Sequence, residues 1–304
     1  MTPMSTRIHL LGAAGQLGAA LALRRPSTAD LVGYTSAEVD LTDAAQVAAA
    51  LRGLAAGDVV INAAAYTDVD GAEQDAATAF AINADGPGRL AAATAAAGAR
   101  LIHVSTDYVF GPPPGRTAPL EPDDLDPAAT PATVYGASKA AGERAALAAD
   151  PSTTIVRTAW VYTGAATSPD FVGTMRRLEA ARPEVAVVDD QRGSPTYVVD
   201  LADGLWELVD QVRRAPARTA GAVLHAAGGG EATWYDLARA VFTEVGADPA
   251  RVRPCTTADF PRPAPRPAFS VLSGRSWAAA GLTPLPHWRT SLAAAVAAAP
   301  DRIP

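Results

Sequence analysis

Short apolar runs alternate with longer alanine-rich stretches through the first half of the chain, which has 304 residues. Short apolar runs bounded by turn residues predict buried strands, and the stretches between them predict helices. The alternation predicts an α/β fold, a doubly wound parallel sheet of the Rossmann type with helices on both faces. The predicted strands are residues 7–11, 30–33, 58–63, 100–105 and 154–157, and the predicted helices are residues 16–23, 44–54, 76–98 and 135–149.

The pattern loosens after about residue 160, where prolines and glycines become more frequent, notably in residues 254–267. A helix over residues 200–212 and a strand over residues 222–226 still continue the first pattern. We therefore expect a dinucleotide-binding domain and a smaller, partly interleaved substrate-binding domain. The expected boundaries are 1–160 and 197–230 for the first domain, and 161–196 and 231–304 for the second.

Composition narrows the class of protein. The net charge of −7 without a clustered basic stretch makes nucleic acid and anionic membranes poor candidate partners. Cys255 is the only cysteine, which fits a reducing compartment, and no apolar stretch is long enough to span a bilayer, so we expect a cytoplasmic protein. No two of the four histidines lie at ligand spacing, so no catalytic metal is expected.

A glycine-rich motif, Gly-Ala-Ala-Gly-Gln-Leu-Gly at residues 12–18, directly follows the first predicted strand and opens the first helix. Glycines there let the backbone approach a pyrophosphate, and the helix N-terminus supplies unpaired N–H groups. Glycines that serve only turns and helix packing are the alternative, but this position in a βα unit favours a dinucleotide. The spacing is similar to that of the short-chain dehydrogenase superfamily. The expected cofactor contacts in this motif are Gly12, Ala14, Gly15, Gln16 and Leu17.

The end of the second strand bears on the choice of cofactor. Residues 32–36 contain no acidic residue that would hold a ribose 2′-hydroxyl. A 2′-phosphate would meet no repulsion there, with Thr35 and Ser36 as candidate donors, so we expect NADPH, with NADH as the alternative. Asp40 and Leu41 resemble the pair that contacts adenine in the same superfamily.

Tyr135 and Lys139 are spaced i, i+4 on a predicted helix and therefore lie on one face. A ketone reduced by hydride develops an alkoxide and needs a proton donor at that oxygen. A nearby ammonium lowers the pKa of a phenol and can also hold the nicotinamide ribose. Lys139 is the only lysine in the chain, and arginine cannot replace it in this role, which argues against an exposed helical pair without function.

Two more segments end strands at the same edge of the predicted sheet, where ligands of open α/β sheets bind. Residues 105–107, Ser-Thr-Asp, follow the fourth strand, and either Ser105 or Thr106 could hydrogen-bond the substrate oxygen beside Tyr135. Small side chains after the third strand would let a flat cofactor lie close to the backbone. The cofactor contacts expected there are Ala63, Ala64, Ala65 and Tyr66.

Taken together, these motifs resemble the dTDP-4-dehydrorhamnose reductase family, in order over nearly the whole chain. The resemblance implies reduction of the 4-keto group of dTDP-4-dehydro-L-rhamnose to dTDP-L-rhamnose, with a dTDP-sugar as the binding partner. The segments that carry it are residues 12–18, 59–70, 105–110, the Tyr135–Lys139 pair, and residues 157–162, 190–196 and 266–267.

The resemblance also implies roles for single residues. It makes Thr106, Tyr135 and Lys139 the catalytic trio, which decides between Ser105 and Thr106. Arg266 is the candidate contact to the substrate pyrophosphate, because a guanidinium matches paired phosphate oxygens; a surface arginine is the alternative. Contacts to the sugar are implied at Val69, Thr106, Asp107, Tyr108, Tyr135 and Trp160, with a core aromatic as the alternative for Trp160.

The sequence departs from the family pattern at one feature. Some members dimerise around a divalent cation held partly by acidic side chains, and the corresponding positions here are about Ala20 and Val199, which cannot ligate. We therefore expect a monomer or a metal-independent dimer.

Two other functions remain open at this level. One is a 4-ketoreductase for another dTDP-deoxysugar, which would keep the same fold and trio. The other is a non-catalytic NADP-binding regulatory subunit resembling that of methionine adenosyltransferase, against which the intact trio and Trp160 argue.

Overall fold

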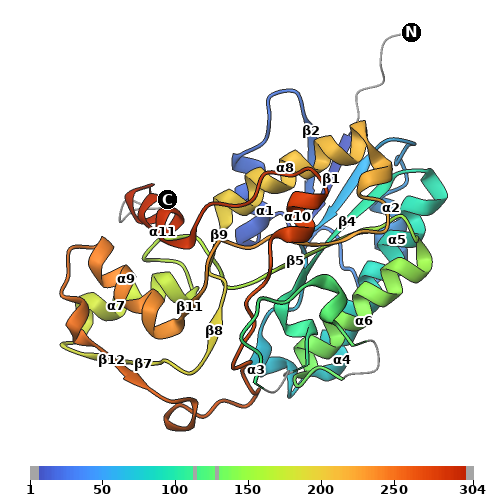
Figure 1. Cartoon of the computed structure of the whole chain (residues 1–304). Helices are drawn as coiled ribbons and strands as arrows, with labels where there is room; N and C mark the ends of the chain where they lie inside the picture. The colour runs from blue at the N-terminus through green and yellow to red at the C-terminus, as the bar shows by residue number, and fades with distance from the viewer. Residues whose placement is uncertain (1–6, 112–114, 127–129, 299–304) are drawn as a thin grey trace.

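The computed structural model describes residues 7–111, 115–126 and 130–298. Its centre is a six-stranded, fully parallel sheet in the order β10-β5-β4-β3-β1-β2 (Figure 1). The predicted doubly wound fold is confirmed. The strands are β1 (Arg7–Leu11), β2 (Asp30–Tyr34), β3 (Val59–Asn62), β4 (Arg100–Thr106), β5 (Thr154–Thr158) and β10 (Val223–His225).

Helices cover both faces of the sheet because alternate strand residues are apolar on both sides. Val60 and Leu101 point into a core with α2 (Ala44–Ala50), α5 (Gly86–Ala97) and α6 (Val134–Ala149). Their neighbours Ile61 and Ile102 point into the opposite core. That core includes residues of α1 (Gln16–Leu23) and α8 (Val198–Arg214).

The order of the strands reverses beside β1. The chain passes from β1 through α1 to β2 on one side, and then through α2 to β3 on the other side. In open α/β sheets, ligands bind at such a switch point, outside the carboxyl ends of the strands. We therefore expect the cofactor site between the carboxyl ends of β1 and β3.

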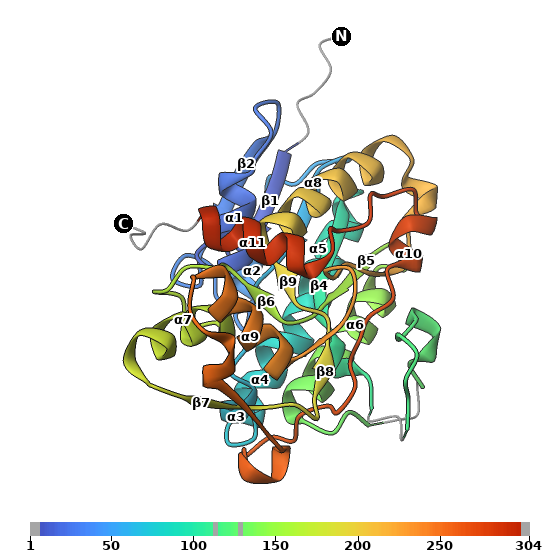
Figure 2. The ribbon, with the colours of Figure 1, turned by 60° about the vertical axis from the view of Figure 1, so that its left-hand side comes forward.

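A second group of elements lies away from this sheet, with α7 and α9 together on one side of the molecule (Figures 1 and 2). It draws on the segments after β5 and after β10, and the paired strands β6 and β9 connect it to the sheet. The helix α10 (Arg275–Ala279) is the exception, because it packs on β10. The other elements are β6 (Val161–Tyr162), α7 (Phe171–Ala181), β7 (Val185–Val188), β8 (Arg192–Gly193), β9 (Thr196–Tyr197), β11 (Ala232–Thr233), α9 (Trp234–Glu244), β12 (Val252–Cys255) and α11 (Trp288–Ala298).

The largest departure from the predicted elements is the helix expected over residues 76–98. It is divided into α4 (Ala76–Phe80), a π-helical turn (Ala81–Asp85) and α5. Inside the turn, the Asn83 side chain accepts from the Tyr66 N–H and donates to the Tyr66 carbonyl, and α6 packs so closely that a Cβ on Gly142 would lie 2.0 Å from the Asn83 oxygen. A tertiary contact therefore widens the helix, which apolar periodicity does not reveal.

Short elements complete the part of the chain that the structure describes. The predicted helix over residues 44–54 ends at Ala50, and a one-turn helix, α3 (Val69–Ala72), begins after Asp68, whose side chain accepts from the Gly71 N–H. No helix within the described ranges is long and apolar enough to cross a membrane. The 3₁₀ turns are Asp107–Val109, Pro122–Asp124, Pro216–Arg218, Pro249–Arg251 and Thr257–Asp259.

Candidate active site

The glycine motif forms a tight loop at the switch point. Gly12 has a φ of +82°, and a Cβ there would lie 2.7 Å from the Ala64 nitrogen. A Cβ on Gly18 would lie 2.1 Å from the Gly12 oxygen, so neither position accepts a side chain. Gly15 caps α1 without a side-chain hydrogen bond, which leaves N–H groups of the first turn for an anion. The loop therefore fits a dinucleotide pyrophosphate.

The Gln16 side chain is hydrogen-bonded within the protein, so only the Gln16 backbone is available for the expected cofactor contact. Its side-chain amide donates to the Ser168 hydroxyl at 2.8 Å and to the Asp170 carboxylate at 3.1 Å. Asp170 caps the N-terminus of α7, so this contact joins the glycine loop to the second group of elements. The remaining group that Gln16 offers to a phosphate is its N–H in the first turn of α1.

The end of β2 has a carboxylate beside it, which its sequence did not predict. Thr35 donates from both its N–H and its hydroxyl to Glu38, each at 2.8 Å. A turn closed by the Glu38 N–H on the Thr35 carbonyl brings this carboxylate back to the strand end. The expectation that no acid lies there was wrong, because Glu38 follows the strand by four residues and returns to it in space. A carboxylate at this place can accept from a ribose diol, which supports NADH as the alternative cofactor.

The pair expected beside the adenine is split between surface and core. Asp40 is exposed and accepts from the Thr42 N–H at 2.8 Å, so it stabilises a turn. Leu41 is 5% exposed, and its carbonyl accepts from Arg89 at 2.9 Å. The structure places Leu41 beside α5, because Gly86 at the start of that helix lies against the Leu41 side chain.

Thr106, Tyr135 and Lys139 come together at the carboxyl end of β4. A Cβ on Gly136 would lie 2.3 Å from the Tyr108 oxygen, so the first turn of α6 sits directly against the turn that follows Thr106. All three side chains are less than a tenth exposed. The Thr106 and Tyr135 hydroxyls are hydrogen-bonded, and the Lys139 ammonium donates to the Val104 carbonyl at 2.7 Å.

Burial controls the ionisation of these groups. It raises the pKa of Tyr135 to about 12, against the opposing hydrogen bond with Thr106. It lowers the pKa of Lys139 to about 8, although Glu143 opposes the shift. Burial therefore determines the phenol pKa rather than Lys139, whose ammonium is bound to the β4 backbone. Tyr135 keeps its proton at neutral pH, as a proton donor must.

Ser105 and Thr106 both contact α6 but have separate environments, because Thr106 meets Tyr135 in the first turn and Ser105 meets Glu143 two turns later. Ser105 donates to Glu143 at 2.5 Å, and Glu143 also accepts from Arg157 at 2.9 and 2.7 Å. This buried network lies one helical turn from Lys139. Glu143 and Arg157 were not identified from the sequence, although the i, i+4 spacing of Lys139 and Glu143 was a signal for them.

The residues expected around the sugar gather near Tyr135. The Tyr108 ring meets the Tyr135 ring edge-on, with 5.5 Å between centroids, and Val69 packs against the same cluster. Asp107 is 2% exposed, and burial raises its pKa to about 6, against hydrogen bonds from Ser270 and Thr106. Tyr135, the expected proton donor, is thus surrounded by the Asp107 carboxyl, whose pKa lies close to neutral pH, the Tyr108 phenol and the apolar Val69 side chain.

Trp160 lies two residues beyond Thr158, which pairs with Thr106 in the sheet. It is the one non-glycine residue with a positive φ, +47°, in the described ranges. Its indole stacks on that of Trp234, with 3.4 Å between ring centroids and 5° between planes. Trp234, which the sequence did not point to, is the first residue of α9.

Arg266 is held at the rim of the same cluster rather than free at the surface. Its two terminal nitrogens donate to the two carboxylate oxygens of Asp70 at 3.0 and 2.8 Å. Burial alone would raise the pKa of Asp70, but hydrogen bonds from Arg266 and Ala264 hold it below its usual value. The Nε of Arg266 has no hydrogen-bond partner among the described residues, so the Nε–Nη2 edge could still take a phosphate.

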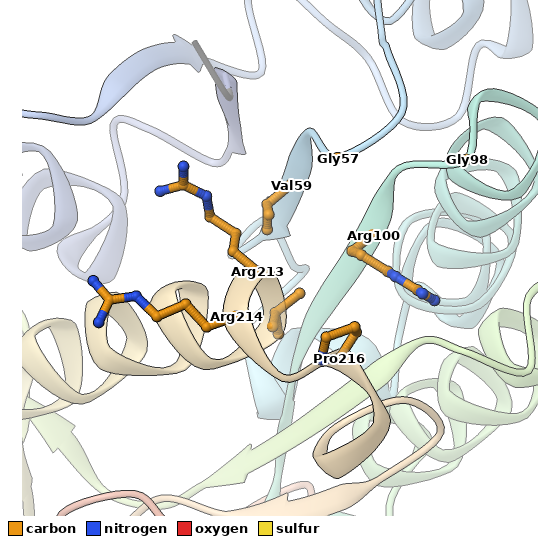
Figure 3. Close-up of a pocket in the computed structure, with 8 residues that line it drawn as sticks. Gly57, Val59, Gly98, Arg100, Arg213, Arg214 and Pro216 are labelled. Atoms are coloured by element: carbon orange, nitrogen blue, oxygen red, sulfur yellow. The ribbon is translucent and has the colours of Figure 1, made fainter. Parts of the chain in front are cut away.

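Two other regions of the molecule lack converging ligand-binding groups among the described residues. The described residues contain no group of three or more His, Cys, Asp or Glu placed to hold a metal, and Ala20 is buried between helices. A cavity of about 480 Å³ lies at the amino ends of β3 and β4, opposite the trio. Figure 3 shows that the guanidinium group of Arg100 points away from those of Arg213 and Arg214 at this cavity, so the three do not converge on an anion.

The doubly wound sheet with its glycine loop is that of a nicotinamide-dependent oxidoreductase of the short-chain dehydrogenase type. Residues 6–300 match the family described as RmlD substrate binding domain. The chain is 54% identical over 98% of its length to a dTDP-4-dehydrorhamnose reductase from Mycobacterium tuberculosis, of which 95% is covered. The chain belongs to the dTDP-4-dehydrorhamnose reductase family.

Two further relatives inform the choice of substrate and cofactor. A probable dTDP-4,6-dihydroxy-2-methyloxan-3-one 4-ketoreductase from Streptomyces antibioticus is 45% identical over 93% of this chain and 92% of its own length. The solved dTDP-4-dehydrorhamnose reductase from Bacillus anthracis, in complex with NADP, superposes with a TM-score of 0.82 at 32% identity. It covers 95% of this chain and 98% of that chain.

Proposed function

We propose that the protein reduces the 4-keto group of dTDP-4-dehydro-L-rhamnose and so forms dTDP-L-rhamnose. The observation that carries this proposal is the buried set of Thr106, Tyr135 and Lys139 at the ligand-binding edge of the sheet. The 54% identity to the mycobacterial reductase supports the choice of substrate.

Residues of the chain supply the proton for the carbonyl oxygen and the positive charge that stabilises the phenolate. A nicotinamide cofactor bound at the glycine loop would supply a hydride to the carbonyl carbon. Tyr135 gives its phenolic proton to the carbonyl oxygen, so that the C=O bond becomes CH–OH and a phenolate remains. Thr106, whose hydroxyl donates to Asp107 in the structure, would turn to donate a hydrogen bond to the developing oxyanion. Lys139 stabilises the phenolate and would hold the nicotinamide ribose.

NADPH is the proposed cofactor, with NADH as the alternative. The glycine loop would hold the pyrophosphate, and the Asp40–Leu41 pair would hold the adenine. The NADP-bound homologue from Bacillus anthracis supports this assignment. The proposed cofactor contacts are Gly12, Ala14, Gly15, Gln16, Leu17, Asp40, Leu41, Ala63, Ala64, Ala65, Tyr66 and Lys139.

The second group of elements, residues 161–196 and 231–304, is proposed as the domain that covers the sugar nucleotide. Arg266 would contact the diphosphate through its Nε–Nη2 edge. We further propose a cytoplasmic monomer or metal-independent dimer, which the single cysteine supports. The proposed sugar contacts are Val69, Thr106, Asp107, Tyr108, Tyr135 and Trp160.

The direct test mixes the purified protein with NADPH and dTDP-4-dehydro-L-rhamnose and follows the loss of nicotinamide absorbance. Formation of dTDP-L-rhamnose, identified by NMR, would support the proposal. Absence of NADPH oxidation by a folded protein that binds NADPH would contradict it and would favour a non-catalytic role.

A 4-ketoreductase acting on another dTDP-deoxysugar is the second candidate, because the Streptomyces antibioticus relative is 45% identical. The trio would do the same chemistry on a different ring. A direct comparison of kcat/KM for the dehydrorhamnose and a dTDP-4-keto-6-deoxyglucose, with NMR of the product configuration, separates the two candidates.

A further inference from the structure

Trp160 adopts a backbone conformation that its own side chain disfavours. Residues with a Cβ rarely adopt a φ of +47°, and a large aromatic side chain makes the conformation a true outlier. Such a conformation persists only where the surroundings impose it, and outliers of this kind cluster at ligand sites. Contacts of the Trp160 ring must therefore oppose the preference of its backbone.

One of these contacts is a glycine. A Cβ on Gly193 would lie 2.4 Å from Cε2 of the Trp160 indole and 2.7 Å from its Nε1, so only glycine allows the ring to lie there. Gly193 pairs with Ala232 across β8 and β11, and α9 begins two residues later at Trp234. A short sheet of the second group of elements thus brings both neighbours to the same ring.

The other contact is an aromatic stack from two helix N-termini. Trp234 covers the Trp160 indole at 3.4 Å between centroids, nearly parallel, and Phe171 packs on Trp234 at 4.5 Å with a 45° tilt. Full overlap of two aromatic rings is less favourable than an offset arrangement. A strained backbone and a fully overlapping aromatic stack therefore meet at one indole.

We infer that Trp234 is a positioning residue: it holds the Trp160 indole, against the preference of the Trp160 backbone, in the orientation that meets the sugar. Trp160 belongs to the chain leaving β5, but Trp234, Phe171 and Gly193 fix its ring from the second group of elements. The inference rests on the proposed function, because the contact of Trp160 with the sugar is part of it. It adds that sugar specificity depends on a residue that need not touch the sugar.

The test compares Trp234→Leu, which removes the stack, with Trp234→Phe, which keeps a stacking ring. Because aromatic pairs contribute about 0.5–1.5 kcal/mol, the KM for the dTDP-sugar should rise about threefold to tenfold in Trp234→Leu and less in Trp234→Phe. The Kd for NADPH should not change. Trp206→Phe is the matched control, because Trp206 is a buried indole in α8 that donates to the Leu21 carbonyl, with no part in the stack.

A spectroscopic measurement separates positioning from general stability. With 5-fluorotryptophan at all five tryptophans, the Trp160 resonance, assigned with Trp160→Phe, should move when dTDP-L-rhamnose is added. In Trp234→Phe the free-state resonance should shift and its response to dTDP-L-rhamnose should shrink. If Trp234→Leu does not fold, Gly193→Ala replaces it, since a methyl group there must push the indole away.

The outcomes distinguish the inference from the proposed function. Wild-type protein that fails to reduce the dTDP-sugar contradicts the proposed function. Wild-type activity combined with unchanged KM and an unchanged Trp160 resonance in the folded Trp234 variants overturns the inference alone. An equal rise in the NADPH Kd and the sugar KM also overturns it, because the stack would then support the fold and not the sugar site.

Discussion

The proposed catalytic trio and the residues proposed to hold ligands are built differently. Thr106 and Tyr135 bind each other, and Lys139 binds the backbone of the same strand, so the trio is assembled within one strand and one helix. The ligand-holding groups are instead bound by residues from elsewhere in the chain. These pairs are Gln16 with Asp170, Trp160 with Trp234, and Arg266 with Asp70. Thr35 and Glu38 are the exception, because they are three residues apart on one turn.

The difference predicts two kinds of mutational effect. Removing a trio member should lower kcat, because the reacting proton or charge is lost from a site that is otherwise complete. Changing a partner of a ligand-holding residue should alter KM or cofactor choice with a smaller effect on kcat. Single substitutions in each group of residues can therefore separate effects on kcat from effects on KM and cofactor choice.

Tyr135→Phe should remove most turnover and leave NADPH affinity unchanged, because only the proton donor is lost. General acid catalysis contributes roughly 10²–10⁴-fold, so kcat should fall by at least that range. The measurement is steady-state kcat together with the NADPH Kd from fluorescence titration. Turnover near that of the wild type in the purified variant would show that another group protonates the product.

Lys139→Arg should be severely impaired although the charge is kept. Lys139 is 2% exposed and its ammonium donates to the Val104 carbonyl, a space that a planar guanidinium does not fit. Lower kcat and weaker NADPH binding are expected together, with kcat reduced about 10²-fold by the loss of phenolate stabilisation. A variant as active as the wild type would show that Lys139 is not part of the reaction.

The pH dependence follows from the same lysine. Because its pKa is lowered to about 8, the ammonium is present below that pH and is lost as the pH rises through it. The kcat/KM for the dTDP-sugar should therefore fall about tenfold for each pH unit above the pKa. The profile from pH 6 to 10 checks this, and a flat profile above pH 8 would contradict it.

The fold class and the closeness of Tyr135 and Lys139 could be predicted from sequence because both depend on local spacing, whereas the choice of Thr106 over Ser105 depended on the family resemblance. Tyr135 and Lys139 are four residues apart, and the glycine loop lies between a strand and a helix that follow each other directly. The helix over residues 16–23 has the same bounds in the structure. Tertiary contacts do not change the spacing of residues within one such helix or loop.

The partners of the ligand-holding residues could not be predicted because they are distant in sequence. Asp70 and Arg266 are 196 residues apart in the sequence and come together only in the folded chain. The Asp70 carboxylate accepts from both terminal nitrogens of Arg266, and no sequence motif links the two residues. Asn83 widens a helix through contacts with Tyr66, seventeen residues away. Periodicity and motif spacing contain no information on such pairings.

Asp70→Asn should weaken binding of the sugar nucleotide. Asp70 takes the terminal-nitrogen edge of Arg266 and so directs the Nε–Nη2 edge outward, and an amide holds that orientation less well because it can only accept through one oxygen. The KM for the dTDP-sugar should rise roughly threefold to tenfold, with kcat and the NADPH Kd unchanged.

The matched control for this variant is Glu184→Gln, which alters another arginine–carboxylate pair, with Arg253, outside the site. It should leave the KM unchanged. A lower KM in Asp70→Asn would mean that Asp70 competes with the substrate diphosphate for Arg266, and the positioning role would be wrong.

Glu38→Gln should shift cofactor preference towards NADPH by a small factor. Glu38 occupies both donors of Thr35 and places a negative charge at the end of β2, where a 2′-phosphate would lie. Hydrogen bonds from Thr35 lower the pKa of Glu38, so the carboxylate stays charged throughout the working pH range. Because the group is exposed and screened, the ratio of kcat/KM for NADPH to that for NADH should rise only about twofold to fivefold.

The wild-type protein is expected to use NADPH at least as well as NADH, because Thr35 and Ser36 can still donate to a phosphate once Glu38 turns away. Parallel measurement of both cofactors in the wild type and in Glu38→Gln tests the two statements together. Exposed-charge effects weaken with salt, so the difference between the proteins should shrink between low and high ionic strength. A wild type that strongly prefers NADH, combined with no change in Glu38→Gln, would show that the preference is set elsewhere in the adenine site.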